Sequence, residues 1–298
     1  MTEHNTESIR VKLRTVLLIC AAVLVSVLLL SCFTGGGQRL WQELIRTAGL
    51  GPFTGEIPHE GLNIHVLDVG KSDAILVECG DTALLIDTGT PGSAEKIGRY
   101  IKSRDISVLD ALLLSHGDSD HAGGAKKLLE SVPTNEIVTS PFTSVEDTFP
   151  KATCVQVGDV LIYGDLLIEI LGPGRAFEAE NDCSLVFRLW YGPFSMLFCG
   201  DMEAPAERAL LESGQDIYAN VLKVAHHGSD TSTSKAFLEA VQPQYAVISV
   251  GEDRSLLPRN TVLKRLHDAG AEIYRTDKHG TVVFSVRGDD IEIKTERD

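Results

Sequence analysis

The sequence predicts a mixed α/β protein in which two β-sheets pack face to face with helices outside, preceded by one transmembrane or signal segment. Three observations predict this arrangement. Short β-type runs alternate with helical stretches along most of the 298 residues. These elements form two halves, each of which passes from hairpins into α/β units, an order that suits a sheet-on-sheet core. A separate apolar run lies near the N-terminus.

The composition indicates a folded and acidic protein. Hydrophobic residues make up 43% of the chain and charged residues 23%, which supplies enough apolar surface for a sizeable core. The 27 Lys and Arg residues are outnumbered by 42 Asp and Glu residues, so the formal net charge is −15 at pH 7. A negative charge of this size argues against a protein that coats nucleic acid through electrostatic attraction.

The N-terminal segment, residues 1–37, is expected to anchor or export the chain. Arg10, Lys12 and Arg14 precede an apolar run over residues 16–30 that only Ser26 interrupts. With its flanks this run approaches the length of a bilayer-spanning helix, and the cations before it predict an N-terminus-in orientation. The rest of the chain would then lie outside the cytoplasm.

Three interpretations of this segment stay open: an uncleaved single-pass anchor, a cleaved signal peptide, and a lipoprotein signal with Cys32 as the acylated residue. Residues 38–61 are predicted to form a short amphipathic helix (38–48) followed by a linker rich in Gly and Pro. The folded domain is expected to be 62–298.

The folded domain is predicted to begin with strands, because its first β-type runs are separated by Gly-Lys-Ser-Asp and Gly-Asp turns. Helices are expected to alternate with strands after that. In order, we expect strands at 62–69, 74–79 and 82–87, a helix at 93–103, a strand at 109–115, a helix at 122–131, several strands between Cys154 and Cys199, and alternating helices and strands over 203–286.

The segment with the most concentrated chemistry is 112–124, where an apolar strand leads directly into a polar loop. His116, Asp118, Asp120 and His121 lie within six residues of one another. Imidazole and carboxylate groups suit a hydrolytic divalent metal, and a tight loop at a strand end lets them converge. A helix cap needs only one Asp or Ser, so this pattern predicts a metal site.

Two later segments repeat this design. One apolar strand ends just before Asp201, and another ends at the adjacent pair His226 and His227. Each of these segments alone has an ordinary interpretation, as a helix cap or as surface histidines. Together with the first segment they predict that three strand ends bring metal ligands to one edge of the two sheets. Such a site supports an enzyme in which a metal-bound hydroxide attacks a carbonyl or phosphoryl centre.

The chain resembles the metallo-β-lactamase superfamily at these residues, and it looks most like the metallo-hydrolase domain of ComEC competence proteins and their stand-alone relatives. The family signature HxHxDH is here HxDxDH, with Asp118 at the second histidine position. The resemblance covers about residues 62–293. It also rests on the motifs HVLDVGKSDAILVE (65–78), LLIDTG (84–89), NDCSLVFRL (181–189), LFCGD (197–201) and LKVAHHGS (222–229).

The resemblance implies an αββα sandwich with two divalent metal ions, Zn²⁺ or Mn²⁺. Its ligand pattern places His116 and Asp118 on one ion, Asp120 and His121 on the other, Asp201 between the two, and His226 or His227 completing the site. It also implies that Asp87 orients the signature loop. Asp68 and Asp73 either do the same or only shape a turn.

The implied reaction is hydrolysis of a phosphodiester, so the resemblance implies a phosphodiesterase or nuclease that acts on DNA or another phosphodiester. The carboxylate of Asp118 makes the site richer in oxygen and favours Mn²⁺ or Mg²⁺ relative to a histidine-rich zinc site. Two alternatives stay open: hydrolysis of a lactone, thioester or β-lactam, and a metal-binding domain with little turnover.

The expected catalytic residues are Asp120 and His227. Because successive side chains of a strand point to opposite faces, the two adjacent histidines are expected to differ in role. We expect His226 to be the metal ligand and His227 to donate a proton to the leaving group. Oligomeric state does not follow from the sequence.

Overall fold

Two β-sheets dominate residues 57–251 and 256–297, the part of the chain that the computed structural model describes. The predicted membrane or signal segment 1–37 and the predicted helix 38–48 lie outside these residues. No helix within 57–251 and 256–297 has the length and apolar character needed to cross a bilayer.

The first sheet has eight strands in the order β15-β14-β1-β2-β3-β4-β5-β6. Its central members β1 to β3 pair in antiparallel fashion, whereas β3 to β6 are parallel. The strands are β1 (Leu62–Val66), β2 (Ile75–Cys79), β3 (Thr82–Ile86), β4 (Leu109–Leu113), β5 (Thr134–Thr139), β6 (Thr153–Cys154), β14 (Val282–Arg287) and β15 (Asp290–Thr295).

The second sheet has seven strands in the order β13-β12-β11-β10-β9-β8-β7. Here too antiparallel hairpins, β7 to β10, give way to parallel strands, β10 to β13. The strands are β7 (Val160–Tyr163), β8 (Leu166–Gly172), β9 (Val186–Tyr191), β10 (Phe194–Phe198), β11 (Val221–Lys223), β12 (Tyr245–Ile248) and β13 (Glu272–Arg275).

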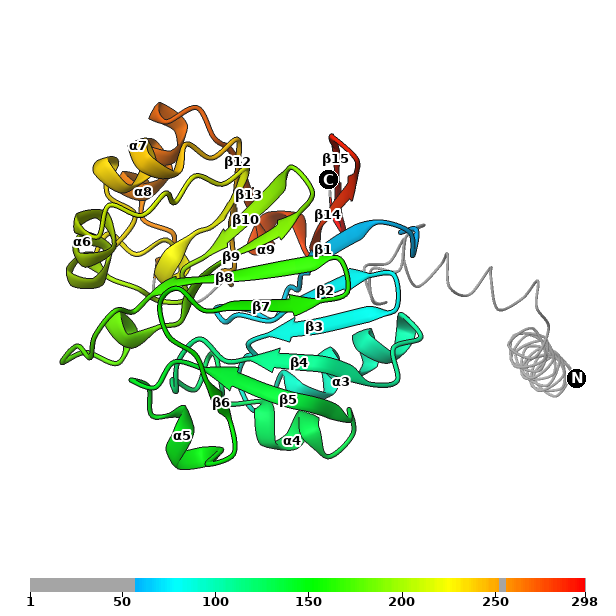
Figure 1. Cartoon of the computed structure of the whole chain (residues 1–298). Coiled ribbons are helices and arrows are strands. Elements are labelled where there is room, and N and C mark those ends of the chain that lie inside the picture. Colours follow the sequence, from blue (N-terminus) through cyan, green and yellow to red (C-terminus); the bar gives the residue numbers. More distant parts are fainter. Residues whose placement is uncertain (1–56, 252–255, 298) are drawn as a thin grey trace, which may run out of the picture. The chain divides into compact units, whose positions relative to one another are not determined.

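Helices cover the outer face of each sheet, as Figure 1 shows, with α3 and α4 on the side of the first sheet and α6, α7 and α8 on the side of the second. The helical elements are α3 (Ala94–Ser103), α4 (Ala125–Leu129), α5 (Val145–Thr148), α6 (Ala204–Glu212), α7 (Lys235–Val241), α8 (Asn260–Asp268), α9 (Thr276–His279), and the 3₁₀ turns η1 (Asn181–Cys183) and η2 (Ala225–Gly228).

The apolar core lies in three layers, which the alternation of strand side chains creates. In β3, Leu84 and Ile86 face the core between the sheets, while Leu85 between them faces the core under α3. Helix α3 completes that outer core with Ile97 and Ile101, one helical turn apart. Because both faces of the central strands are covered, the predicted αββα arrangement is confirmed.

The predicted elements also agree with the structure along the chain. Strands at 62–69, 74–79, 82–87 and 109–115 and the helix at 93–103 correspond to β1, β2, β3, β4 and α3, with ends that differ by a few residues. The helix expected at 122–131 is the shorter α4. The predicted order in each half, hairpins followed by α/β units, is confirmed by the strand pairing.

Candidate metal centre

The polar strand ends meet where the two sheets come together. Strands β3 and β4 are parallel, so the residues that follow them, Asp87 and His116, lie at the same edge of the first sheet. Strands β10 and β11 are parallel too, which puts Asp201 and His227 at one edge of the second sheet. Side-chain contacts join the two edges, since Asp201 Oδ1 lies 3.1 Å from His121 Nε2.

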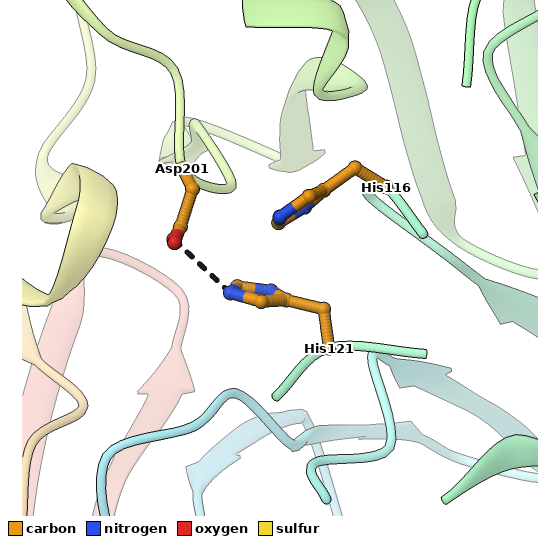
Figure 2. Close-up of side chains that lie close together, drawn as sticks. All are labelled: His116, His121 and Asp201. Atoms are coloured by element: carbon orange, nitrogen blue, oxygen red, sulfur yellow. Dashed lines mark ion pairs between the residues drawn. The ribbon is translucent and has the colours of Figure 1, made fainter. Parts of the chain in front are cut away.

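Four buried ligand-type atoms at this edge lack a hydrogen-bond partner: the Nε2 atoms of His116, His121 and His227 and the Oδ1 atom of Asp201. An orphaned polar atom inside a protein is unfavourable, and several such atoms close together require an explanation. Figure 2 shows the rings of His116 and His121 directed towards Asp201, and the two ring centroids are 4.2 Å apart. A bound cation would satisfy these atoms together, so the residues fit a metal site.

The hydrogen bonds of the three imidazoles assign the tautomer that metal binding needs. His116 Nδ1 donates to Ser115 Oγ at 3.0 Å, His121 Nδ1 to Asp87 Oδ2 at 2.8 Å, and His227 Nδ1 to the carbonyl oxygen of Ser249 at 2.8 Å. Each ring therefore carries its proton on Nδ1, which leaves a lone pair on Nε2. All three lone pairs belong to the orphaned atoms described above.

The ligand-type atoms of the described residues form three overlapping groups, and within each group all ligand atoms lie within 4.8 Å of one another. The first group is His116, His121 and Asp201, the second is Asp120, His121 and His227, and the third is Asp73, Asp87 and His121. Within the second group, His227 Nε2 lies 3.6 Å from Asp120 Oδ2. Five of the seven predicted site residues are thus brought together.

The carboxylates of the site are held in the ionised form. Burial raises the pKa of Asp201, but the imidazoles of His121 and His227 outweigh burial and hold that pKa well below its usual range. Burial also opposes ionisation of Asp120, but the neighbouring imidazole of His227 and the hydrogen bond from the Lys71 ammonium lower its pKa below the ordinary value. Both groups are therefore anionic at neutral pH and suited to bind a cation.

Asp118 lies at the margin of this site. Its Oδ2 is 3.7 Å from His116 Nε2, and about half of its side chain is exposed. The neighbouring imidazole of His116 lowers the pKa of Asp118. Asp118 does not belong to any of the three groups of convergent atoms in the part of the chain that the structure describes.

The adjacent histidines occupy very different environments. The ring of His227 is fully buried between Asp120 and Asp201, whereas that of His226 is 22% exposed. His226 Nδ1 lies 3.0 Å from Glu203 Oε1, and its Nε2 is 3.8 Å from Asp201 Oδ2. Strained left-handed backbone at both histidines, with φ values of 49° and 51°, turns one ring inward and the other outward. The structure thus gives His227 the buried surroundings that were expected for His226.

Asp87 organises the first half of the site, as predicted. Its Oδ1 accepts the backbone N–H of Ser115 at 2.8 Å, and its Oδ2 accepts Ser115 Oγ–H at 2.7 Å and His121 Nδ1–H at 2.8 Å. Asp73 lies beneath the site, 3.9 Å from His121 Nδ1. Asp68 lies outside it and contacts Arg297.

Three contacts at or beside the candidate site were not expected from the sequence. Lys71 Nζ lies 2.8 Å from Asp120 Oδ2, and the buried Lys223 Nζ lies 2.7 Å from Asp73 Oδ2. The third is the contact of Glu203 with His226 described above. Lys71 stands in a Gly-Lys-Ser-Asp turn and Lys223 directly before the histidine segment, but a lysine in either place ordinarily indicates exposed surface.

The comparison with known proteins agrees with the fold. Competence protein ComA of Neisseria gonorrhoeae is 33% identical over 276 residues, 91% of this chain and 38% of that protein. ComE operon protein 3 of Bacillus subtilis is 31% identical over 252 residues, 74% of this chain and 32% of that protein. The chain spans about a third of the length of these curated relatives.

A solved structure shows the same fold. The metallo-beta-lactamase fold protein YhfI from Bacillus subtilis matches with a TM-score of 0.55 at 16% identity, covering 76% of this chain and 100% of that one. A family model of the metallo-beta-lactamase superfamily matches residues 67–252, which is more than half of the sequence. The resemblance predicted from the motifs is confirmed, and the chain belongs to the metallo-β-lactamase superfamily.

Proposed function

We propose that this chain is a metal-dependent hydrolase that cleaves phosphodiesters, with DNA as one candidate substrate. The observation that carries the proposal is the convergence of four buried, unpartnered ligand atoms from both sheets. The competence relatives support a nucleic-acid substrate, since their similarity covers most of this chain. The carboxylate-rich ligand set supports hard divalent ions.

Two divalent ions, Zn²⁺ or Mn²⁺, fit the residues present. In this proposal His116, Asp118 and Asp201 would hold one ion, and Asp120, His121 and His227 together with Asp201 would hold the other. When bound, such ions polarise a phosphoryl oxygen and lower the pKa of water towards neutrality. The chain itself fixes the histidine tautomers through Asp87, Ser115 and Ser249.

The geometry favours exchanging the roles expected for the two adjacent histidines. His227 is buried among the candidate ligands, so we assign it to the metal. His226 reaches solvent, and Glu203 lies 3.0 Å from its Nδ1, which leaves Nε2 directed towards Asp201 at 3.8 Å. As the imidazolium, with Nδ1–H held by Glu203, His226 would give its Nε2 proton to the departing oxygen and become neutral.

This assignment is tested with His226→Ala and His227→Ala. His227→Ala should lose bound metal, as measured by elemental analysis. His226→Ala should keep its metal and lose about 10²- to 10⁴-fold in rate on a dinucleotide, whose leaving group is poor, but much less on bis(p-nitrophenyl) phosphate. Equal metal loss in both variants would show that the pair only binds metal.

The substrate class is tested on the wild-type protein loaded with Mn²⁺ or Zn²⁺. We expect hydrolysis of bis(p-nitrophenyl) phosphate and of DNA, and none after Asp201→Asn. Preferential cleavage of a lactone, a thioester or a cephalosporin would replace the phosphodiesterase proposal with the other hydrolase. If the protein bound metal but hydrolysed none of these substrates, the interpretation as a metal-binding domain with little turnover would replace the enzyme proposal.

The location of the reaction is a further part of the proposal. Residues 1–37, with the apolar run and the cations before it, support membrane attachment with the domain outside the cytoplasm. Protease added to intact cells should remove the domain, and complete protection would refute this location. Labelled fatty acid on the wild type, lost in Cys32→Ala, would select the lipoprotein interpretation.

A further inference from the structure

The turn between β1 and β2 brings a lysine to the seam between the two sheets. The Asp73 N–H in this turn donates to the carbonyl oxygen of Asp120 at 3.1 Å, which ties the turn to the signature loop. On the other side, a Cβ added to Gly251 would lie 2.7 Å from the backbone nitrogen of Lys71, so the loop after β12 packs directly against the turn. The backbone of Lys71 is therefore fixed by both halves of the site.

The ammonium group of Lys71 reaches the candidate metal centre itself. Its Nζ lies 2.8 Å from Asp120 Oδ2, the same oxygen that is 3.6 Å from His227 Nε2. The Lys71 side chain is 29% exposed and that of Asp120 is 20% exposed, whereas His227 is fully buried. Lys71 thus approaches the site from the side that opens to solvent, where a substrate must enter.

The site is rich in negative charge, so a lysine beside it bears on which substrates can bind. Three carboxylates, Asp118, Asp120 and Asp201, contribute negative charge to a chain whose formal net charge is already −15. Bound divalent ions would offset these three charges, but an anionic substrate still meets the negative field of the acidic chain unless positive charge lies beside its path. Lysine binds anionic oxygen as a point charge on a flexible four-carbon stem, so it can turn from Asp120 towards a bound anion.

We propose that Lys71 is a specificity-determining residue that binds a non-bridging oxygen of a phosphoryl anion in front of the metal centre. This inference rests on the proposed phosphodiesterase function and names the group that recognises its substrate. A neutral substrate such as a carboxylic ester has no anionic oxygen for this contact, so Lys71 favours anions over neutral esters.

The test measures binding of inorganic phosphate to the metal-loaded protein by calorimetry. Lys71→Met removes the charge and keeps the length of the side chain, Lys71→Gln removes the charge with a polar group, and Lys71→Arg keeps the charge. Lys127→Met is the matched control, since Lys127 is half exposed and pairs with Glu95 on the outer helices. Metal content and thermal unfolding are measured for every variant.

We expect Lys71→Met and Lys71→Gln to weaken phosphate binding by about 10-fold to 100-fold, which is the range of a charge-assisted hydrogen bond. Lys71→Arg should stay within about 3-fold of the wild type, and Lys127→Met should equal it. Metal content should not change. With bis(p-nitrophenyl) phosphate as substrate, the loss in Lys71→Met should appear mainly in KM.

Several results would overturn the inference. Unchanged phosphate affinity in a folded, metal-loaded Lys71→Met or Lys71→Gln protein would show that Lys71 does not contact the anion. Loss of metal in these variants would make Lys71 a support of the ligand loop instead. Absence of phosphate binding by the wild type would refute both this inference and the proposed function. Phosphate binding that depends on Lys71, without phosphodiester hydrolysis, would support the inference and refute only the proposed function.

Discussion

Replacing Asp87 with Asn tests whether this buried carboxylate sets the tautomer of His121, a candidate metal ligand. The carboxylate accepts three hydrogen bonds, two from Ser115 and one from His121 Nδ1. Asn has nearly the same shape and tolerates the left-handed backbone of this position, where φ is 57°. The substitution therefore changes charge and hydrogen bonding with little change in packing.

The expected losses in metal affinity and in stability follow from the hydrogen bonds that Asn cannot form. Its amide oxygen still accepts the Ser115 N–H, but its NH₂ group faces Ser115 Oγ and His121 Nδ1, which both donate to Asp87 in the wild type. To avoid two opposed donors, His121 must carry its proton on Nε2, where the lone pair for a metal is needed. We expect metal affinity to fall about 10-fold to 100-fold. Loss of two charge-assisted hydrogen bonds should lower the free energy of unfolding by about 3 kcal/mol.

The assay is titration of Mn²⁺ or Zn²⁺ into metal-free protein in competition with a chelator, alongside denaturant unfolding. Asp110→Asn is the matched control, because Asp110 Oδ2 accepts the backbone N–H of Ala83 at 2.9 Å and an amide oxygen can take over that role. We expect the control to stay within about 0.5 kcal/mol of the wild type. Wild-type metal affinity in Asp87→Asn would refute the tautomer argument.

Two other predictions follow from buried features. Glu78 pairs with the buried Arg104 at 2.9 Å, so Glu78→Gln should lower the free energy of unfolding by about 3 kcal/mol at pH 7. Burial opposes ionisation of Glu78, but its partners lower its pKa from 4.5 to about 2. The difference in free energy of unfolding between Glu78→Gln and wild type, measured with denaturant, should therefore shrink as the pH falls from about 4.5 to about 2. Gly200→Ala should destabilise the protein by about 2 kcal/mol or more and reduce bound metal, because φ is 52° and the new Cβ would lie 2.8 Å from Ser184. Gly214→Ala, with φ of 72° and no atom within 4 Å of the added Cβ, is its control and should keep its metal.

The results that would contradict these two predictions are specific. If the free energy of unfolding of Glu78→Gln differed from that of wild type by a constant amount across that pH range, the ionised carboxylate would not be what stabilises the fold. Equal effects of Gly200→Ala and Gly214→Ala would mean that backbone strain alone acts at Gly200, and that its contact with Ser184 is unimportant.

Much of the site could be predicted from the sequence because each part of it lies next to a strong local signal. An apolar run that ends in His116 or Asp201 marks the end of a buried strand, and parallel strands bring such ends to one edge. The side chains that converge there are therefore already adjacent to strand signals that a single sequence contains.

The orientation of the His226 and His227 rings could not be predicted, because it depends on a backbone conformation for which the sequence contains no signal. Strand alternation does not apply here, since β11 ends at Lys223 and the pair lies in a strained turn. The inward ring, that of His227, is held by the carbonyl oxygen of Ser249, which lies directly after β12 and far from the pair in the sequence.

The ion pair between Lys223 and Asp73 could not be predicted either. Lysine is seldom buried, and its partner comes from the opposite sheet, so nothing near it in the sequence signals the contact. Asp182, which stands before β9, is equally ambiguous in sequence. In the structure its Oδ1 accepts the N–H groups of Glu203 and Ala206 at the start of α6.

The division of the candidate ligands between two sheets makes a bound metal a cross-link through the middle of the domain. His116 and His121 move with the first sheet, and Asp201 and His227 with the second, so the spacing of the sheets is also the spacing of the ligands. That spacing depends on packing of the central core between the sheets, to which neighbouring strands of the second sheet contribute Phe187 and Phe198, with ring centroids 4.8 Å apart. By thermodynamic reciprocity, whatever loosens this packing weakens metal binding, and the metal in turn tightens the packing. A substitution in the central core, away from the candidate ligands, would therefore be expected to change the metal affinity.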